Sequence, residues 1–150
     1  MTSGYQPLGG VIVSREICDL LEDDRDFYLR HGFTYSGHPA CAVAGLANID
    51  IIEREGLLDR ANQIGDHYAE GLKALVADGT LSGYRGAGAL WSAQLPEGTT
   101  PEQTVAARDR ALDLGVIFRP IGDSLALCPP LVISDVELDQ CLDVLAQVAS

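Results

Sequence analysis

The C-terminal part of the sequence alternates apolar stretches with two helix-start motifs, and this alternation limits the possible folds most strongly. The first motif is Thr100-Pro101-Glu102-Gln103, in which the Thr and Gln can cap a helix start reciprocally and the Pro suits the first helical position. The second pairs Ser134 with Glu137 at the same spacing. Between the motifs, residues 116–119 and 124–128 are typical of strands joined by a turn. We predict a small α/β sandwich with its helices on one face.

Three further segments extend this pattern. Residues 57–76 place apolar side chains along one stripe, with Gly79 after the end, which predicts an amphipathic helix. Residues 81–95 indicate a strand interrupted by Arg85-Gly86-Ala87-Gly88. The last helix should pack its core through residues at helical spacing: Leu138, Cys141, Leu142, Leu145 and Val148.

The N-terminal part has a different character. Residues 11–13, Val-Ile-Val, suggest a buried strand, and Ser14 can cap a short helix after it. The acidic cluster Glu22-Asp23-Asp24 with Asp26 is interpreted as a solvated surface, because it lacks the spacing of a calcium loop. Residues 40–52 are rich in Ala and Gly and carry no charge before Asp50, which predicts a helix buried on most sides.

The stretch His31-Gly32-Phe33-Thr34-Tyr35-Ser36-Gly37-His38-Pro39 precedes that helix and carries most of the functional signal. Its final Pro occupies a first helical position, so backbone and hydroxyl donors gather where a helix begins. Such a site suits an anion such as a phosphate. A capped helix start with no ligand explains the same residues, and the local pattern leaves both interpretations open.

Net charge and cysteine spacing exclude several functional classes. A formal charge of −12 disfavours binding to nucleic acid or to an anionic membrane. The four cysteines form no CxxC pair, which argues against a zinc site and indicates reduced, mostly buried thiols. No apolar run approaches the roughly 20 residues that span a bilayer, and the N-terminus lacks signal-peptide features. These features favour a soluble, cytoplasmic protein.

A few single residues could also carry chemistry. Arg119 ends an apolar strand, where a guanidinium needs either an internal carboxylate partner or a substrate carboxylate. Gly86 and Gly88 hint at a dinucleotide turn, but the rest of that fingerprint is missing, so a strand bend is favoured. His67 lies inside the amphipathic helix beside Tyr68, and it is interpreted as a residue at the boundary of the apolar stripe and not as a ligand.

Three segments in this order carry a family resemblance. They are Thr2-Ser3-Gly4-Tyr5-Gln6-Pro7-Leu8-Gly9-Gly10, the stretch over residues 31–39, and Phe118-Arg119-Pro120-Ile121-Gly122-Asp123 leading to Pro129-Pro130-Leu131. Together they resemble the C-terminal third of class III, pyridoxal-phosphate-dependent aminotransferases, and in particular ω-amino acid:pyruvate transaminases. The resemblance implies the C-terminal portion of the type I fold. Residues 1–55 would end the large domain, and residues 56–150 would form the small domain.

The resemblance also implies roles for matched residues. Thr34 would bind the cofactor phosphate of the neighbouring subunit in a homodimer, and Phe33 would lend a backbone amide. Arg119 would pair with a substrate carboxylate and swing away for an uncharged amine. Arg85 matches an arginine with a structural role, and His38 would help to pack the loop. The reaction implied is amino transfer from an ω-amino acid or amine to a 2-oxo acid such as pyruvate.

One family feature has no counterpart in the sequence. The lysine that holds the cofactor stands three residues before the position of Thr2 in the family, and the only lysine here is Lys73, on the polar side of a helix. We therefore expect a fragment, inactive by itself, whose upstream DNA reads Lys-Gly in frame. The alternative is a non-catalytic binding or oligomerisation module derived from an aminotransferase. A bare nucleotide-binding domain is a weaker alternative.

Overall fold

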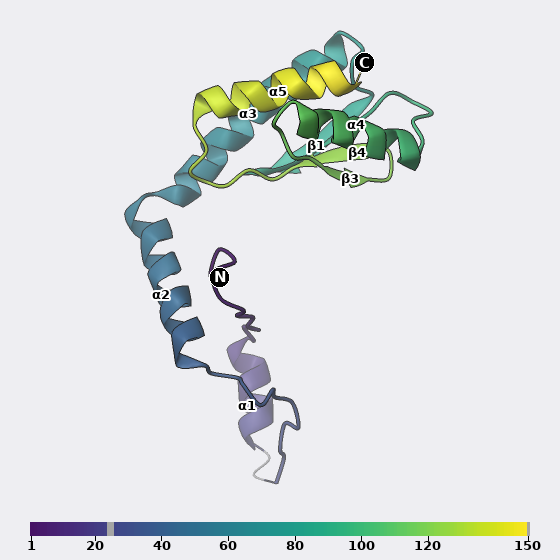
Figure 1. The fold of residues 1–150 in the computed structure, drawn as a ribbon. Coiled ribbons are helices and arrows are strands. Elements are labelled where there is room, and N and C mark those ends of the chain that lie inside the picture. The colour runs from purple at the N-terminus through teal and green to yellow at the C-terminus, as the bar shows by residue number, and fades with distance from the viewer. Residues whose placement is uncertain (24–25, 150) are drawn as a thin grey trace. The chain divides into compact units, whose positions relative to one another are not determined.

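The computed structural model describes residues 1–23 and 26–149, which divide into two compact units. The N-terminal unit, Met1–Glu55, contains helices α1 (Arg15–Asp23) and α2 (Pro39–Arg54). The C-terminal unit, Gly56–Ser150, contains three helices and a four-stranded antiparallel sheet (Figure 1). The chain therefore has the mixed α/β composition that the sequence predicts.

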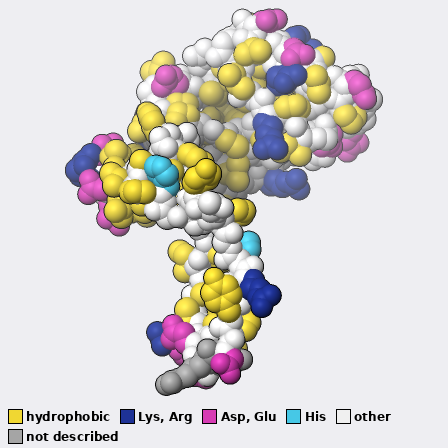
Figure 2. All heavy atoms as spheres, turned by 60° about the horizontal axis from the view of Figure 1, so that its bottom comes forward, with side chains coloured by type: hydrophobic (Ala, Val, Ile, Leu, Met, Phe, Trp, Pro, Cys, Tyr) yellow, Lys and Arg dark blue, Asp and Glu magenta, His cyan; other side chains and the backbone are white. Residues whose placement is uncertain are grey.

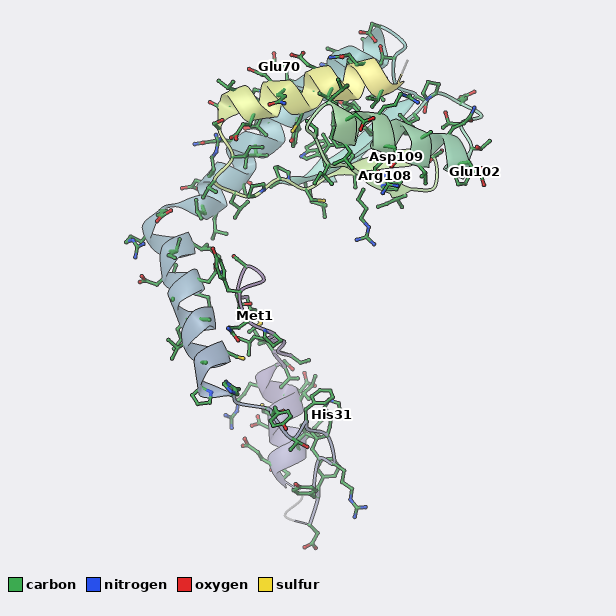
Figure 3. The ribbon with its side chains drawn as sticks, in the orientation of Figure 1. Met1, His31, Glu70, Glu102, Arg108 and Asp109 are labelled. Atoms are coloured by element: carbon green, nitrogen blue, oxygen red, sulfur yellow. The ribbon has the colours of Figure 1, made fainter. Side chains whose placement is uncertain are left out.

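The first ten residues of the N-terminal unit pack against α2. Asn48 on α2 donates a hydrogen bond from Nδ2 to the carbonyl of Met1 at 3.0 Å, and it accepts one from Ser3 Oγ at 2.6 Å (Figure 3). A Cβ on Gly45 would lie only 2.8 Å from the side chain of Leu8. The small residues of α2 thus permit the close approach of a neighbour, as the sequence suggests.

Two predictions for this unit are wrong. Residues 11–13 form no strand, and Val11 and Ile12 are almost fully exposed. The physical reason is that no strand in the described part of this unit is available to pair with them. Helix α2 is also not buried on most sides, because only Cys41 and Gly45 are buried while apolar side chains such as Leu46 are exposed.

Helix α1 begins where the sequence predicts. The amide of Ile17 donates to Ser14 Oγ at 3.4 Å, which is a weak version of the expected cap. The helix buries no residue. In the acidic cluster, Glu22 and Asp23 are exposed, whereas Asp24 lies outside the described residues.

The C-terminal unit has helices α3 (Leu57–Ala77), α4 (Pro101–Asp113) and α5 (Asp135–Ala149). The strands are β1 (Gly83–Ala87), β2 (Leu90–Gln94), β3 (Arg119–Ile121) and β4 (Ser124–Leu127), in the sheet order β1-β2-β4-β3. Both predicted helix starts are confirmed. Thr100 and Gln103 form a reciprocal capping box, and Glu137 accepts hydrogen bonds from the amide and hydroxyl of Ser134.

The core of this unit lies between the helices and one face of the sheet. The apolar stripe of α3 is buried, with Ile64, Tyr68 and Leu72 almost inaccessible to solvent. A Cβ on Gly65 would lie 2.8 Å from the carbonyl oxygen of Gly88, so α3 crosses closely over the β1–β2 turn. The predicted core of α5 is buried at Leu138, Leu145 and Val148 and half-buried at Cys141 and Leu142. These contacts cover the sheet on one side only.

Two strand predictions need correction. Residues 81–95 are a hairpin, not one interrupted strand, and the turn contains Gly88 at φ +51°. The Trp91 indole N–H stabilises this turn by donating to the carbonyl of Gly88 at 2.7 Å. Arg119 begins β3 instead of ending a strand, because pairing with β4 extends over residues 119–121. Register with a partner strand, not apolar composition, defines the strand here.

Candidate functional site

The loop before α2 forms a tight turn with free hydrogen-bond donors beside it. The amide of Ser36 donates to the carbonyl of Phe33 at 2.9 Å, and Gly37 adopts φ +72°, which a side chain would disfavour. Pro39 is the first residue of α2, as predicted, and His38 precedes it. His38 gives no side-chain cap to α2, so the first helical amides remain available to an anion.

The two residues that the family resemblance assigns to the cofactor differ in availability. Thr34 is exposed, and its hydroxyl has no hydrogen-bond partner within the described chain. The Phe33 amide instead donates to Ser36 Oγ at 3.1 Å, so it is already occupied. The Phe33 ring makes an edge contact with His31, at a centroid distance of 5.7 Å. The Thr34 hydroxyl is therefore available to a ligand, whereas the Phe33 amide is not.

A hollow brings two of the sequence motifs together in the N-terminal unit. Residues 7–11 line one side, and residues 31–33 and 35–38 line another, with Cys41 between them. Phe33 lines this hollow, whereas Thr34 does not. The sequence predicted both motifs but not their proximity.

Arg119 lies on β3 in the C-terminal unit, separate from the unit that holds Phe33 and Thr34. Its register partner is Ala126 on β4. The neighbours Phe118 and Pro120 face the core side, so Arg119 projects from the face of the sheet that the helices leave free. It is exposed and forms no ion pair with any described Asp or Glu. The internal carboxylate partner considered from the sequence is thus not found in the described chain.

A polar cluster beside Arg85 in the same sheet was not predicted. Asp123 accepts hydrogen bonds from Gln94 Nε2 and Ser124 Oγ, each at 2.9 Å. The Gln94 hydrogen bond, followed by that of Ser124, lowers the pKa of the Asp123 carboxyl, and Arg85 adds a smaller attraction. Strand alternation could have grouped these residues, but the register that aligns them was not visible in the sequence.

The C-terminal unit also has a mainly apolar hollow, lined by residues that include Tyr68, Cys128 and Cys141. Burial is the largest cause that raises the pKa of both the Tyr68 phenol and the Cys141 thiol, so both stay uncharged near neutral pH. All four cysteines are free, as predicted, but only Cys41 is buried. The expectation of mostly buried thiols is therefore wrong.

The remaining candidates do not form a site. Lys73 is exposed on α3. His67 is half-buried, and its Nε2 lies 2.8 Å from Asp139 on α5, which agrees with its interpretation as a boundary residue. Within residues 1–23 and 26–149, no cluster of three or more His, Cys, Asp or Glu side chains could hold a metal ion. No helix of the described chain is both long and apolar enough to cross a bilayer.

Comparison with known proteins adds family information to this geometry. The family model for class-III aminotransferases matches residues 1–149. The chain is 34% identical over 150 residues to the putrescine–pyruvate aminotransferase of Pseudomonas aeruginosa, covering 95% of this chain and 32% of that protein. It is 39% identical to the diaminobutyrate–2-oxoglutarate transaminase of Halomonas elongata, covering 93% of this chain and 33% of the relative.

Solved structures agree with these relatives. An amine transaminase from an uncultivated Pseudomonas species, solved in a form with bound pyridoxal phosphate (PLP), matches with a TM-score of 0.91 and 33% identity, covering 99% of this chain and 36% of that one. An (S)-enantioselective ω-transaminase from Thermomicrobium roseum matches with a TM-score of 0.89 and 34% identity, covering 98% and 34%. The chain spans about a third of the length of these proteins. It belongs to the class-III aminotransferase family.

Proposed function

We propose that this chain forms the phosphate-binding and carboxylate-binding parts of a pyridoxal-phosphate-dependent aminotransferase. The reaction proposed is transfer of an amino group from an ω-amino acid or amine to a 2-oxo acid such as pyruvate. Family membership supports the reaction class. The cofactor, when bound, supplies the electron sink for the chemistry, and the residues of this chain bind and orient the reacting molecules.

The two units correspond, in this proposal, to two domains of the family fold. Residues 1–55 would be the end of the large domain, and residues 56–150 would be the small domain. The division of the contacts between residues 55 and 56 supports this assignment. The N-terminal unit then contributes the phosphate-binding groups, and the C-terminal unit contributes the carboxylate-binding arginine.

The observation that carries the proposal is the free anion-binding surface before α2. The uncapped start of α2 presents backbone N–H groups, and the exposed Thr34 hydroxyl adds a donor without a partner in the described chain. These groups fit a phosphate. Phe33 contributes its amide only if the hydrogen bond from that amide to Ser36 Oγ breaks.

Arg119 is proposed to bind the substrate carboxylate. Its guanidinium is exposed and has no carboxylate partner among the described residues, so a bidentate contact with a substrate needs no internal ion pair to break. An exposed side chain without an internal partner can also move aside for an amine that lacks a carboxylate. The proposal therefore keeps Arg119 as a substrate-binding residue.

No residue of this chain is proposed as catalytic. Lys73 is the only lysine in the sequence, and it lies exposed on the surface of α3. We expect the isolated chain to give no amine-to-pyruvate turnover. Borohydride trapping of an adduct at Lys73, together with such turnover, would contradict this part of the proposal.

The assembly proposed is a cytoplasmic homodimer that binds neither nucleic acid nor membrane. In it, Thr34 would serve the phosphate site of the partner subunit, as the family resemblance implies. The net charge of −12 supports the absence of nucleic-acid binding, since a phosphate backbone would be repelled. Sedimentation at several protein concentrations measures the assembly state.

The phosphate site is tested by titrating the ¹⁵N-labelled chain with pyridoxamine phosphate and, separately, with pyridoxamine. We expect the amide signals of Thr34, Ala40 and Cys41 to shift only with the phosphorylated compound, and Thr34→Ala to weaken binding several-fold. Thr99→Ala is the matched control, because the Thr99 hydroxyl donates within its own loop, to Pro96. Equal shifts with both compounds, or no shift with either, would refute the phosphate site.

A second candidate function is a non-catalytic oligomerisation module. The exposed apolar side chains of α2, which include Val43, Leu46 and Ile49, favour it. The titration above separates the two candidates. A discrete oligomer that ignores pyridoxamine phosphate would favour the module over the aminotransferase part.

A further inference from the structure

A turn over residues 33–36 contains Thr34, and two hydrogen bonds between the same two residues close it. The amide of Ser36 donates to the carbonyl of Phe33 at 2.9 Å, and the amide of Phe33 donates to Ser36 Oγ at 3.1 Å. The first bond occurs in many turns and needs no particular side chain, whereas the second needs a hydroxyl at residue 36. The Ser36 hydroxyl therefore fixes the residue that immediately precedes Thr34.

Contacts hold the residue before Thr34 but not the Thr34 side chain itself. Besides its two hydrogen bonds to Ser36, Phe33 packs its ring edge-on against His31. The Thr34 hydroxyl has no hydrogen-bond partner within the described chain. The place that this hydroxyl can reach, relative to the start of α2 at Pro39, is therefore set by the backbone of the turn.

The Ser36 side chain contributes nothing else to the fold that the structure describes. Ser36 is exposed, and within residues 1–23 and 26–149 its hydroxyl has the Phe33 amide as its one hydrogen-bond partner. Because Phe33 is exposed as well, water can bind its amide when the hydroxyl is removed. Loss of the hydroxyl should thus loosen the turn and leave both units folded.

We propose that Ser36 is a positioning residue, which holds the turn so that the Thr34 hydroxyl points to the cofactor phosphate. The inference rests on the proposed function, in which Thr34 donates to that phosphate. A donor that is held in place before the ligand arrives loses less conformational freedom on binding than a donor on a loose loop. Ser36 acts through Thr34 and does not touch the phosphate.

The test is a double-mutant cycle of Thr34 and Ser36, measured by titrating the ¹⁵N-labelled full chain with pyridoxamine phosphate. In the chain that keeps Thr34, Ser36→Ala should weaken binding about three- to tenfold, the effect expected for loss of one hydrogen bond. In the Thr34→Ala background, the same change should weaken binding less than about twofold, since no hydroxyl remains to be positioned. Hydrogen exchange of the Phe33 amide should be faster in Ser36→Ala.

Two variants control for the hydroxyl group and for general effects on the N-terminal unit. Ser36→Thr keeps a hydroxyl at the same position and should bind within about twofold of the unaltered chain. Ser14→Ala removes a hydroxyl that also accepts an amide three residues away, that of Ile17, but outside the turn. Ser14→Ala should leave the affinity unchanged. Pyridoxamine, which lacks the phosphate, should shift no amide signal of the turn in any variant.

The outcomes separate this inference from the proposed function. If Thr34→Ala binds pyridoxamine phosphate as the unaltered chain does, or if neither binds it, the phosphate site is refuted, and the role of Ser36 with it. If Thr34→Ala weakens binding but Ser36→Ala does not, only the role of Ser36 is refuted.

The cycle also distinguishes positioning from direct binding. An equal loss from Ser36→Ala with and without the Thr34 hydroxyl would mean that Ser36 binds the phosphate itself, which overturns the positioning role. A loss that Ser36→Thr does not restore, or that Ser14→Ala reproduces, overturns it as well. A loss that depends on Thr34 and is restored by Ser36→Thr supports the inference.

Discussion

The two units of this chain use their apolar residues differently. In the C-terminal unit, side chains from all three helices and from the sheet form one continuous buried core. In the N-terminal unit, α1 buries nothing and α2 buries only Cys41 and Gly45. Figure 2 shows the resulting hydrophobic side chains at the surface. An apolar sequence is therefore necessary for a core, but a partner surface decides whether the core forms.

The largest expected difference between the units comes from truncating leucines. Leu145→Ala removes a side chain with 0% exposure and should destabilise the C-terminal unit by about 2–5 kcal/mol, because a cavity remains. Leu46→Ala, at 68% exposure on α2, should change the same transition by less than about 0.5 kcal/mol. Denaturant unfolding followed by the fluorescence of Trp91, the only tryptophan, measures both. Similar decreases in the free energy of unfolding for the two variants would show that the two units are energetically coupled.

Glycine positions give the next largest contrast. Gly65→Ala places a Cβ 2.8 Å from the carbonyl oxygen of Gly88, a backbone atom that cannot easily move, and should cost about 1–3 kcal/mol. Gly32→Ala, in the loop before α2, meets no atom within 4 Å and should be close to neutral. Melting temperatures of the two variants test this. A stable Gly65→Ala protein would mean that α3 does not cross the hairpin turn so closely.

Helix capping differs between the units as well. Thr100→Ala breaks the reciprocal cap of α4 and should destabilise the C-terminal unit by about 1 kcal/mol. Helix α2 has no side-chain cap, so His38→Asn should instead stabilise its start by a few tenths of a kcal/mol, up to about 1 kcal/mol. Urea unfolding and far-ultraviolet circular dichroism measure the two effects. A loss of helix in His38→Asn would show that His38 stabilises the start of α2 in another way.

The smallest expected effect is a pH dependence at the start of α5. Hydrogen bonds from Ser134 lower the pKa of the Glu137 carboxyl below its ordinary value of 4.5. Because the pKa of Glu137 is lower in the folded than in the unfolded chain, the ionised carboxylate stabilises the fold fully above pH 4.5. This stabilisation is lost as the pH falls from 4.5 through the lower pKa of the folded state. Glu137→Gln should therefore lower the melting temperature near pH 7 and reduce its fall below pH 4.5. An unchanged pH profile would contradict the role of Glu137.

Sequence alone identified the features that depend on neighbouring residues. The starts of α2, α4 and α5 were predicted because a Pro or a capping pair acts within one helical turn. The amphipathic α3 was predicted because its stripe follows the helical period. The same local patterns supported the family resemblance, which the match over residues 1–149 confirms.

Tertiary structure decided everything that depends on a distant partner. Val11 and Ile12 have the composition of a strand but pair with none in the described chain, so they are exposed. The hairpin at Gly88 and the pairing of Arg119 with Ala126 follow from strand register, which links residues far apart and leaves no mark on either strand alone. The sequence by itself determined where helices begin and which family the chain resembles. Pairing and packing decided which apolar residues are buried and which polar residues lie together, because burial and register are properties of two surfaces in contact.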